Sequence, residues 1–278
     1  MEKLTMLVAT DFAESSAAVL KKAIDFAQKT QATLHVVHVV ENTFFQKNQN
    51  IDFIKEHCWD SMLSHYPSLH KEHFYCFEGN VETVVAIVAQ TIGAKIVLIG
   101  DNRDKHPLEA IFISSDTKAI IRESHTPVLV AKNHENRVYN TILIPTDLSK
   151  DSWAMIQHMT YLFPESLLIL LHLYSVPFEF RLGMYGFNES EIISFHEESR
   201  KAAETELNTF IQALDVPAKN IIPIVRKDLL NSERFEANHK DLRADLVAIH
   251  TTGNISFFAF DLLEKSQSDV LIYKVNHD

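Results

Sequence analysis

The sequence predicts an α/β protein in which one fold with a parallel sheet is repeated along the chain. Two stretches carry the first observation: residues 4–12 read LTMLVATDF and residues 141–148 read TILIPTDL, so each is an apolar run that stops at Thr-Asp. Each is followed by a serine-containing segment that looks like a helix start. The second observation is that strand-like and helix-like segments alternate throughout, which is typical of βαβ units.

The first half contains five strand-like segments. The first, residues 4–10, is continuously apolar, as expected where both faces of a sheet are covered. The next segment has apolar residues at helical spacing, and we expect Ser15 or Ser16 to cap it. The expected strands are 4–10, 33–40, 73–77, 94–99 and 126–131, and the expected helices are 13–28, 51–65, 81–92 and one that ends at 124.

The second half repeats this order. The segment between its fourth and fifth strands is shorter than its counterpart by about two helical turns. We therefore predict a first domain at 1–133, a linker at 134–140 and a second domain at 141–278. The expected strands are 141–146, 167–173, 221–225, 244–249 and 269–274, with helices at 189–214 and 231–242.

Composition narrows the function classes. A net charge of −11 argues against nucleic acid or a membrane surface as a partner. The N-terminus does not resemble a signal peptide and no apolar run could span a membrane, so we expect a cytoplasmic protein. Two cysteines, Cys58 and Cys76, predict reduced thiols rather than a disulfide framework, and the fifteen histidines lack a metal-binding spacing.

Any ligand site is expected outside the carboxyl ends of the strands, where open parallel sheets bind ligands. In each half the Thr-Asp after the first strand, the end of the second strand and the loop after the fourth strand should converge there.

Several motifs together resemble the universal stress protein family (UspA-like), as a tandem of two such domains over nearly the whole chain. They are VATDF and IPTDL, the HV and HL that end the second strands, AKIVLIG, and IIRESHTPVLV. The resemblance implies flavodoxin-like or Rossmann-like domains, each a five-stranded parallel sheet of order 3-2-1-4-5 with helices on both faces.

Some members of that family bind ATP through a G-x-x-G motif, nine residues and then G-S or G-T after the fourth strand. Glycines let main-chain N–H groups approach phosphates, and the closing pair opens a helix whose N-terminus favours an anion. By this resemblance Asp11 would meet the adenosine end and the main chain of Val39 the base. Gly100 matches the first glycine, but Arg103 replaces the second and could either compensate phosphate charge or fill the pocket.

The closing pair is also altered. Counting forward from Gly100 places Ile113 and Ser114 at that position, whereas counting back from Pro127 places Ser114 and Ser115 there. The candidate nucleotide-binding residues of the first half are therefore Asp11, Val39, Gly100, Arg103, Ser114 and Ser115.

The second half departs further from the motif. HTTG at 250–253 keeps only the second glycine, and no G-S pair follows it. We expect Phe257, Phe258 and Phe260 to pack over the former pocket and Asp147 to act as a helix cap.

Two further features leave alternatives open. His38 and His172 lie in apolar strands and are expected to be buried polar groups with hydrogen-bond partners. The aromatic loop at 177–187 could be a lid on the second pocket, a contact surface or part of the core, and we favour the core.

These observations favour a non-enzymatic stress-response protein that binds and signals. The two fifth strands, 128–131 and 270–273, are expected to pair antiparallel and make an intramolecular pseudo-dimer. One alternative is an ATP or AMP sensor, with Mg²⁺, that uses the first-half pocket and has at most slow hydrolysis. Another is a small-molecule or partner-binding module at the aromatic loop; a protein partner or a homodimer would fit this family.

Overall fold

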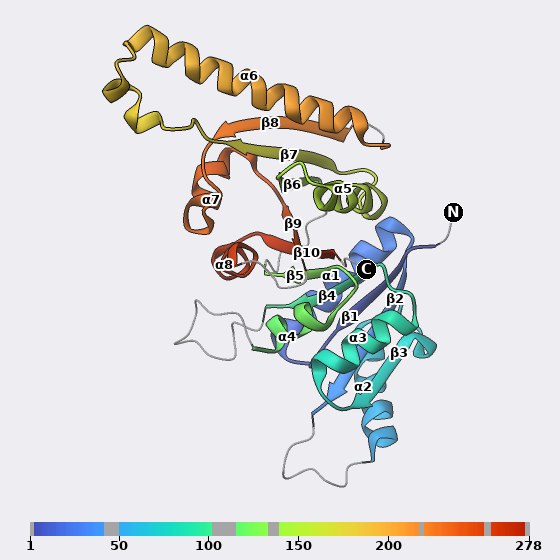
Figure 1. The fold of residues 1–278 in the computed structure, drawn as a ribbon. Coiled ribbons are helices and arrows are strands. Elements are labelled where there is room, and N and C mark those ends of the chain that lie inside the picture. The colour runs from blue at the N-terminus through green and yellow to red at the C-terminus, as the bar shows by residue number, and fades with distance from the viewer. Residues whose placement is uncertain are drawn as a thin grey trace. The chain divides into compact units, whose positions relative to one another are not determined.

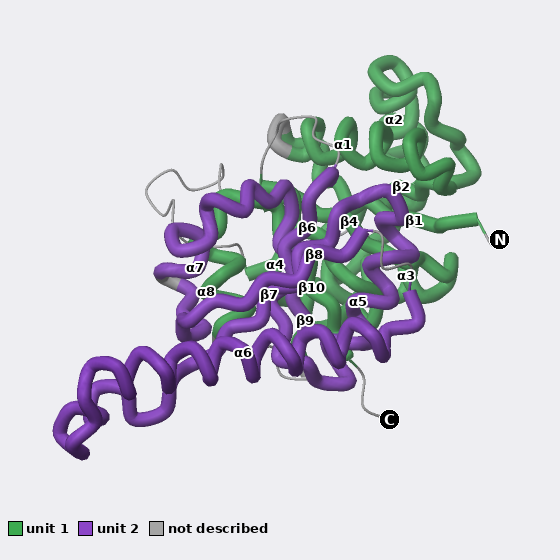
Figure 2. Tube along the Cα trace, turned by 90° about the horizontal axis from the view of Figure 1, so that it is seen from above, with its two compact units in different colours: residues 1–138, 251–278 green, residues 139–250 purple. Residues whose placement is uncertain are grey.

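The computed structural model describes residues 3–41, 50–101, 115–132, 139–216, 220–252 and 257–275. The chain divides into two compact units, Met1–Val138 with Thr251–Asp278, and Tyr139–His250 (Figure 2). The last helix and strand of the second repeat therefore group with the first unit. The boundaries at 133 and 141 follow the sequence repeat, and they stay a prediction about that repeat.

Unit 1 is a parallel α/β sheet with one antiparallel strand added (Figure 1). Its strands follow the order β3-β2-β1-β4-β5-β10, and the first five are parallel. The elements are β1 Thr5–Ala9, α1 Glu14–Thr30, β2 Thr33–Val40, α2 Ile51–His65, β3 Phe74–Glu78, α3 Val81–Thr91, β4 Ile96–Gly100, α4 Ser115–Glu123, β5 Val128–Ala131, α8 Phe257–Lys265 and β10 Asp269–Val275. The order 3-2-1-4-5 expected for the first half is confirmed.

The core of unit 1 is the sheet itself. Met6, Leu7 and Val8 are consecutive in β1 and all fully buried, so both faces of the strand are covered, as the continuous apolar sequence predicted. Helices lie on both faces of this sheet (Figure 1). Because β1, β2 and β4 are parallel neighbours, their carboxyl ends lie together at the same end of the sheet.

Antiparallel pairing of β5 with β10 covers the edge that β5 would otherwise expose. Val270 lies opposite Val130, and Ile272 lies opposite Val128. The predicted pairing of the two fifth strands is thus confirmed.

Buried charges hold the added strand in place. Lys22 Nζ of α1 lies 2.5 Å from Asp269 Oδ2 at the start of β10, with both side chains almost fully buried. Asp269 Oδ1 also accepts a hydrogen bond of 2.8 Å from the main-chain N–H of Lys132, just after β5. The ammonium of Lys132 donates in turn to the carbonyls of Leu263 and Ser266 at the end of α8, where a cation is favourable.

Helix α8 contacts α4 within unit 1. The Phe260 ring lies 5.1 Å from the guanidinium carbon of Arg122 and 5.8 Å from Lys118 Nζ, both on α4. The packing of Phe257, Phe258 and Phe260 over the second-half pocket stays a prediction. The side chain of Phe257 lies outside the described residues.

Unit 2 repeats the parallel arrangement with four strands in the order β9-β6-β7-β8. The elements are β6 Thr141–Thr146, α5 Lys150–Leu162, β7 Leu167–Tyr174, α6 Glu189–Ala213, β8 Ile221–Lys227, α7 Ser232–His239 and β9 Leu246–Thr252. The last residues of β9, Thr251 and Thr252, are grouped with unit 1. Short 3-10 turns, η3 Glu179–Arg181 and η4 Gly183–Tyr185, follow β7.

The helix starts differ from the predicted caps. Ala13 is the N-cap of α1 and makes no side-chain cap, while Ser16 donates to Asp11 instead of capping. In unit 2 the cap of α5 is Ser149, which accepts a 3.2 Å hydrogen bond from the N–H of Ser152, so Asp147 is not the cap. The apolar sequence locates both helices, but in α1 the carboxylate of Asp11 takes the hydroxyl of Ser16 that was expected to cap.

The aromatic loop at 177–187 is exposed, so the prediction that it belongs to the core is wrong. Phe180 is 79% exposed and Met184 is 84% exposed, and only Leu182 in this loop is buried. Among the described residues no helix is long and apolar enough to cross a membrane.

Candidate functional site

The turn after β1 is built by short-range hydrogen bonds that orient Asp11. Thr10 Oγ1 accepts from the N–H of Phe12 at 3.2 Å, and Asp11 Oδ1 accepts from the N–H of Ala13 at 3.0 Å and from the hydroxyl of Ser16. Phe12 takes the left-handed conformation, φ 59°, which is uncommon for a residue with a side chain. The turn thereby presents the Asp11 carboxylate at the carboxyl end of the sheet.

The turn after β6 has the same hydrogen bonds. Thr146 Oγ1 accepts from Leu148 N–H at 3.1 Å, and Asp147 Oδ1 accepts from Ser149 N–H at 3.0 Å and from Ser152 Oγ at 2.6 Å. Leu148 is left-handed as well, with φ 61°. The repeat read from the Thr-Asp motifs is therefore a repeat of local geometry and not only of residue types.

The two strand histidines support these turns. His38 Nδ1 lies 2.9 Å from the carbonyl oxygen of Thr10, and His172 Nδ1 lies 3.2 Å from that of Thr146. Both rings are half-buried. Each therefore ties the second strand of its half to the turn, as the expected hydrogen-bonded role requires.

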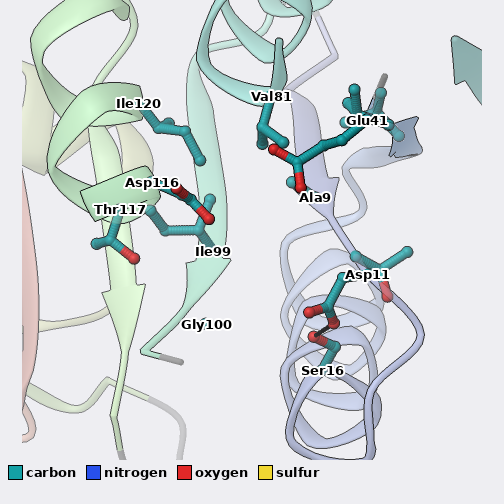
Figure 3. Close-up of a pocket in the computed structure, with 13 residues that line it drawn as sticks. Ala9, Asp11, Ser16, Glu41, Val81, Ile99, Gly100, Asp116, Thr117 and Ile120 are labelled. Carbon is teal, nitrogen blue, oxygen red and sulfur yellow. Dashed lines mark hydrogen bonds between the residues drawn. The ribbon is translucent and has the colours of Figure 1, made fainter. Parts of the chain in front are cut away.

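A cavity lies at the carboxyl end of the unit 1 sheet, where three of the predicted residues meet (Figure 3). Asp11, Val39 and Gly100 all line it. Its volume is about 100 Å³, less than the roughly 300 Å³ or more of most ligand pockets. The other lining residues are Ala9, Thr10, Ser16, Val37, Glu41, Val81, Ile99, Asp116, Thr117 and Ile120.

Gly100 has a packing reason to be glycine. A Cβ added there would lie 3.1 Å from Val19 Cγ2 of α1, which is tighter than ordinary contact. The glycine therefore lets α1 approach the end of β4 and leaves its main chain open to the cavity.

Charge around the cavity is acidic. Among the residues that the structure describes, its lining includes the carboxylates of Asp11, Glu41 and Asp116, which Figure 3 shows, and no lysine or arginine. Carboxylates accept hydrogen bonds from hydroxyl and amino groups and repel phosphate. The described lining thus suits the uncharged, hydrogen-bond-donating part of a ligand better than its phosphates.

The remaining predicted residues are placed less favourably. Ser115 is the first residue of α4, is exposed, and donates to Asp116 Oδ1 at 3.1 Å without lining the cavity. Arg103 and Ser114 lie outside the described residues. Sequence reasoning missed Glu41, Asp116 and Thr117. The signal available was their position, which is directly after the second strand for Glu41 and in the first turn of α4 for the other two.

The corresponding place in unit 2 is occupied by an imidazole. His250 stands at the position of Gly100 in the repeat, with its Nε2 3.8 Å from Asp147 Oδ2 and its Nδ1 3.5 Å from Ser152 Oγ. Burial would raise the pKa of Asp147, but hydrogen bonds from Ser149 and Ser152 and the nearby His250 outweigh it, so the pKa is lowered. The repeat alignment of Gly100 with His250 was the signal for this contact.

Asp147, Ser152 and His250 do not form a catalytic triad. Ser152 is fully buried, and its hydroxyl donates to the carboxylate rather than to the imidazole. A serine nucleophile needs an exposed hydroxyl hydrogen-bonded to its base. Across the part of the chain that the structure describes, no group of three or more His, Cys, Asp or Glu side chains could hold a metal ion.

Comparison with known proteins gives a consistent picture. Residues 4–132 match the universal stress protein family. A protein of unknown function from Pseudomonas aeruginosa PAO1 is 17% identical, with 98% of this chain and 93% of that chain covered and a TM-score of 0.68. A universal stress protein from Archaeoglobus fulgidus DSM 4304 is 13% identical, with 97% and 96% covered and a TM-score of 0.65. At these identities the structures show a shared fold along the whole chain. No curated protein matched the sequence.

Proposed function

We propose that this chain, whose residues 4–132 match the universal stress protein family, is a stress-response protein that acts by binding and signalling and not by catalysis. In this proposal it is cytoplasmic, and neither nucleic acid nor a membrane is its partner, in keeping with its net charge of −11. The single observation that carries the proposal is that the two repeated turns have different surroundings. Asp11 of the first turn lines a cavity, whereas Asp147 of the second turn is in contact with His250.

The hydroxyls near the two aspartates argue against turnover. Ser16 and Ser152 both donate to a carboxylate, and both are buried. Neither hydroxyl is exposed as a serine nucleophile must be, although Ser152 Oγ lies 3.5 Å from His250 Nδ1. A sensitive phosphate-release assay with ATP and Mg²⁺ should therefore give no rate above a buffer control, and measurable turnover that disappears in Asp11→Ala would overturn the non-enzymatic proposal.

A second candidate function is nucleotide sensing by the first-half cavity. It is favoured because Asp11, Val39 and Gly100, which the family resemblance assigns to the adenosine end, the base and the phosphate loop, line one cavity. The three carboxylates of its lining predict an order of affinity. Adenosine and AMP should bind at least as tightly as ATP without Mg²⁺, because each added phosphate brings negative charge towards carboxylates. Adding Mg²⁺, which offsets the phosphate charge, should reduce the difference in affinity between ATP and AMP.

The test is calorimetric titration of the full chain with adenosine, AMP and ATP, with and without Mg²⁺. Asp11→Ala should weaken binding at least tenfold, the loss of one or two hydrogen bonds to a charged group. Asp147→Ala is the matched control, because Asp147 makes the same turn hydrogen bonds in the other half, and it should leave the affinity unchanged. No heat at millimolar nucleotide, or equal effects of both variants, would exclude the first-half pocket as a nucleotide site.

A further inference from the structure

The helix that follows the second strand is longer in the second half than in the first. Helix α6 has 25 residues, whereas α2, at the same place in the first repeat, has 15. Figures 1 and 2 show its N-terminal part and the loop before it extending beyond the strands of unit 2. We call residues 176–199, which include η3, η4 and the first part of α6, the arm.

The arm is ordered by its own contacts. Leu182 is 4% exposed and forms its interior. The loop joins α6 through a capping box between Asn188 and Glu191, and His196 Nε2 lies 3.2 Å from Glu179 Oε1. Lys227 at the end of β8 also donates to Glu179 at 2.5 Å. A surface held in this way loses little conformational entropy when something binds to it.

The outer surface of the arm is apolar. Six of the sixteen exposed large apolar side chains among the described residues lie within this one short segment. They are Phe178 at 62%, Phe180 at 79%, Met184 at 84%, Tyr185 at 59%, Phe187 at 42% and Ile193 at 59% exposed. Exposed aromatic and methionine side chains gathered in one place mark an interaction surface, because such residues are enriched in the centres of protein interfaces.

The area of this surface matches what a symmetric dimer needs. At about 200 Å² for each fully exposed large side chain, the six would remove roughly 700–800 Å² from water on each chain. Two such surfaces in contact would bury about 1,500 Å² in total, close to a standard stable interface.

Charge also favours a second copy over other partners. The loop at 177–188 contains one acidic residue, Glu179, and one basic residue, Arg181, in a chain whose net charge is −11. Glu179 is paired with Lys227, and the Arg181 guanidinium carbon lies 5.1 Å from the centre of its neighbour Phe180. Two of these loops can therefore meet without the repulsion that the rest of this acidic chain would produce, whereas a strongly charged partner would find no matching field on them. The acidic residues of the arm other than Glu179 lie on α6, which begins after the loop.

We propose that the arm is a dimerisation surface, and that two copies of this chain associate arm to arm about a two-fold axis. In such an isologous contact each copy presents the same apolar surface to the other. Phe180 and Met184, the most exposed of the six, lie at its centre and become buried on association. The proposal is independent of whether the first-half cavity binds a nucleotide.

The test is sedimentation velocity of the full chain over a range from about 1 to 200 μM, with the double variant Phe180→Glu/Met184→Glu. The wild type should sediment as a dimer at the upper concentrations and the double variant as a monomer, with the dissociation constant of the dimer raised at least a hundredfold. Because both side chains are exposed, the circular dichroism spectrum and the urea midpoint should be unchanged. The matched control is Phe53→Glu, an aromatic residue of α2 that is 70% exposed, and it should associate like the wild type.

A cross-link supplies a second, local readout. Met184→Cys in a Cys58→Ser/Cys76→Ser background should form a disulfide-linked dimer under mild oxidation, while Phe53→Cys in the same background should not. A wild type that remains monomeric at 200 μM would overturn the proposal. So would a dimer that Phe180→Glu/Met184→Glu leaves intact.

Discussion

The buried ion pair between Lys22 and Asp269 is expected to be a main determinant of the stability of unit 1. It joins α1 to β10, the strand that the second repeat contributes to the first unit, and its side chains are 4% and 1% exposed. Asp269→Asn keeps an oxygen for the main-chain N–H of Lys132 but removes the charge opposite a buried ammonium. Breaking a buried pair from one side typically costs about 3–5 kcal/mol, because the remaining charge is left without its counter-ion.

The chain offers a matched control for this experiment. Lys71 and Glu56 also lie 2.5 Å apart, but their side chains are 49% and 55% exposed. An exposed pair contributes about 0–1 kcal/mol. Lys71→Met should therefore change the free energy of unfolding by less than 1 kcal/mol, even though the distance between the charged atoms is the same.

Urea unfolding followed by tryptophan fluorescence measures both variants. Trp59 lies buried in unit 1 and Trp153 is half-buried in unit 2, so a Trp153→Phe background makes the signal report unit 1. Asp269→Asn should lower the free energy of unfolding by about 3–5 kcal/mol, and the double variant Lys22→Met/Asp269→Asn should recover much of that loss. A loss below 1 kcal/mol for Asp269→Asn, or no recovery in the double variant, would refute the assignment of β10 to unit 1 through this pair.

Three smaller predictions follow from pKa shifts. Burial, with a smaller effect of His73, lowers the pKa of His35 from 6.5 to about 4, so between these pH values the unfolded chain binds a proton that the folded chain does not. The free energy of unfolding should therefore fall by about 2 kcal/mol as the pH drops from 6.5 to 4. His35→Asn should flatten that part of the plot of urea midpoint against pH, and an unchanged slope would contradict the role of His35. The pKa of Asp147 is lowered in the folded chain, so its ionised carboxylate contributes to stability above the unfolded pKa of about 3.9, and this contribution is lost as the pH falls through the folded pKa. The difference in the free energy of unfolding between wild type and Asp147→Asn should therefore be larger at pH 6 than at pH 3. Burial and, to a smaller extent, the neighbouring Cys58 raise the pKa of the Cys76 thiol to about 11. At pH 8 this thiol should therefore react with iodoacetamide at least a hundredfold more slowly in the native chain than in urea. Equal rates would show that the native thiol is ionised or exposed.

The regular elements could be predicted because their sequences are continuous apolar runs or helical patterns. The strand at 33–40 and the helix at 51–65 were placed at their observed ends, since Thr33 begins a β-branched run and Asn50 caps the helix. The pairing of β5 with β10 was also predictable, because an uncovered parallel edge needs a partner.

Features that depend on contacts between distant residues could not be predicted in the same way. The hydroxyl of Ser16 donates a hydrogen bond to the carboxylate of Asp11. The capping prediction therefore failed because the turn after β1 competes with the helix for the same hydroxyl. The loop at 177–187 looks like core by composition, and only the length of α6 carries it beyond the strands. Phe260 packs on α4 because α8 joins the first unit, which no periodicity in its own sequence reveals.

The candidate site was predictable in part. Asp11, Val39 and Gly100 line one cavity because the carboxyl ends of β1, β2 and β4 meet at one edge of the sheet. The acidic character of that cavity comes from Glu41 and Asp116, whose side chains turn towards the same space from different elements. A motif search for glycines cannot see this, because the charge of a cavity is a property of the assembled edge.

The central claim is that only the first of the two repeated turns retains a ligand site, and a crystal structure of the full chain with AMP tests it most directly. We expect density for the nucleotide beside Asp11 and Gly100, with the adenosine nearer the carboxylate, and none beside Asp147, where His250 remains in contact with the carboxylate. Density beside Asp147 with His250 displaced, or an empty first-half cavity at millimolar AMP, would contradict the claim.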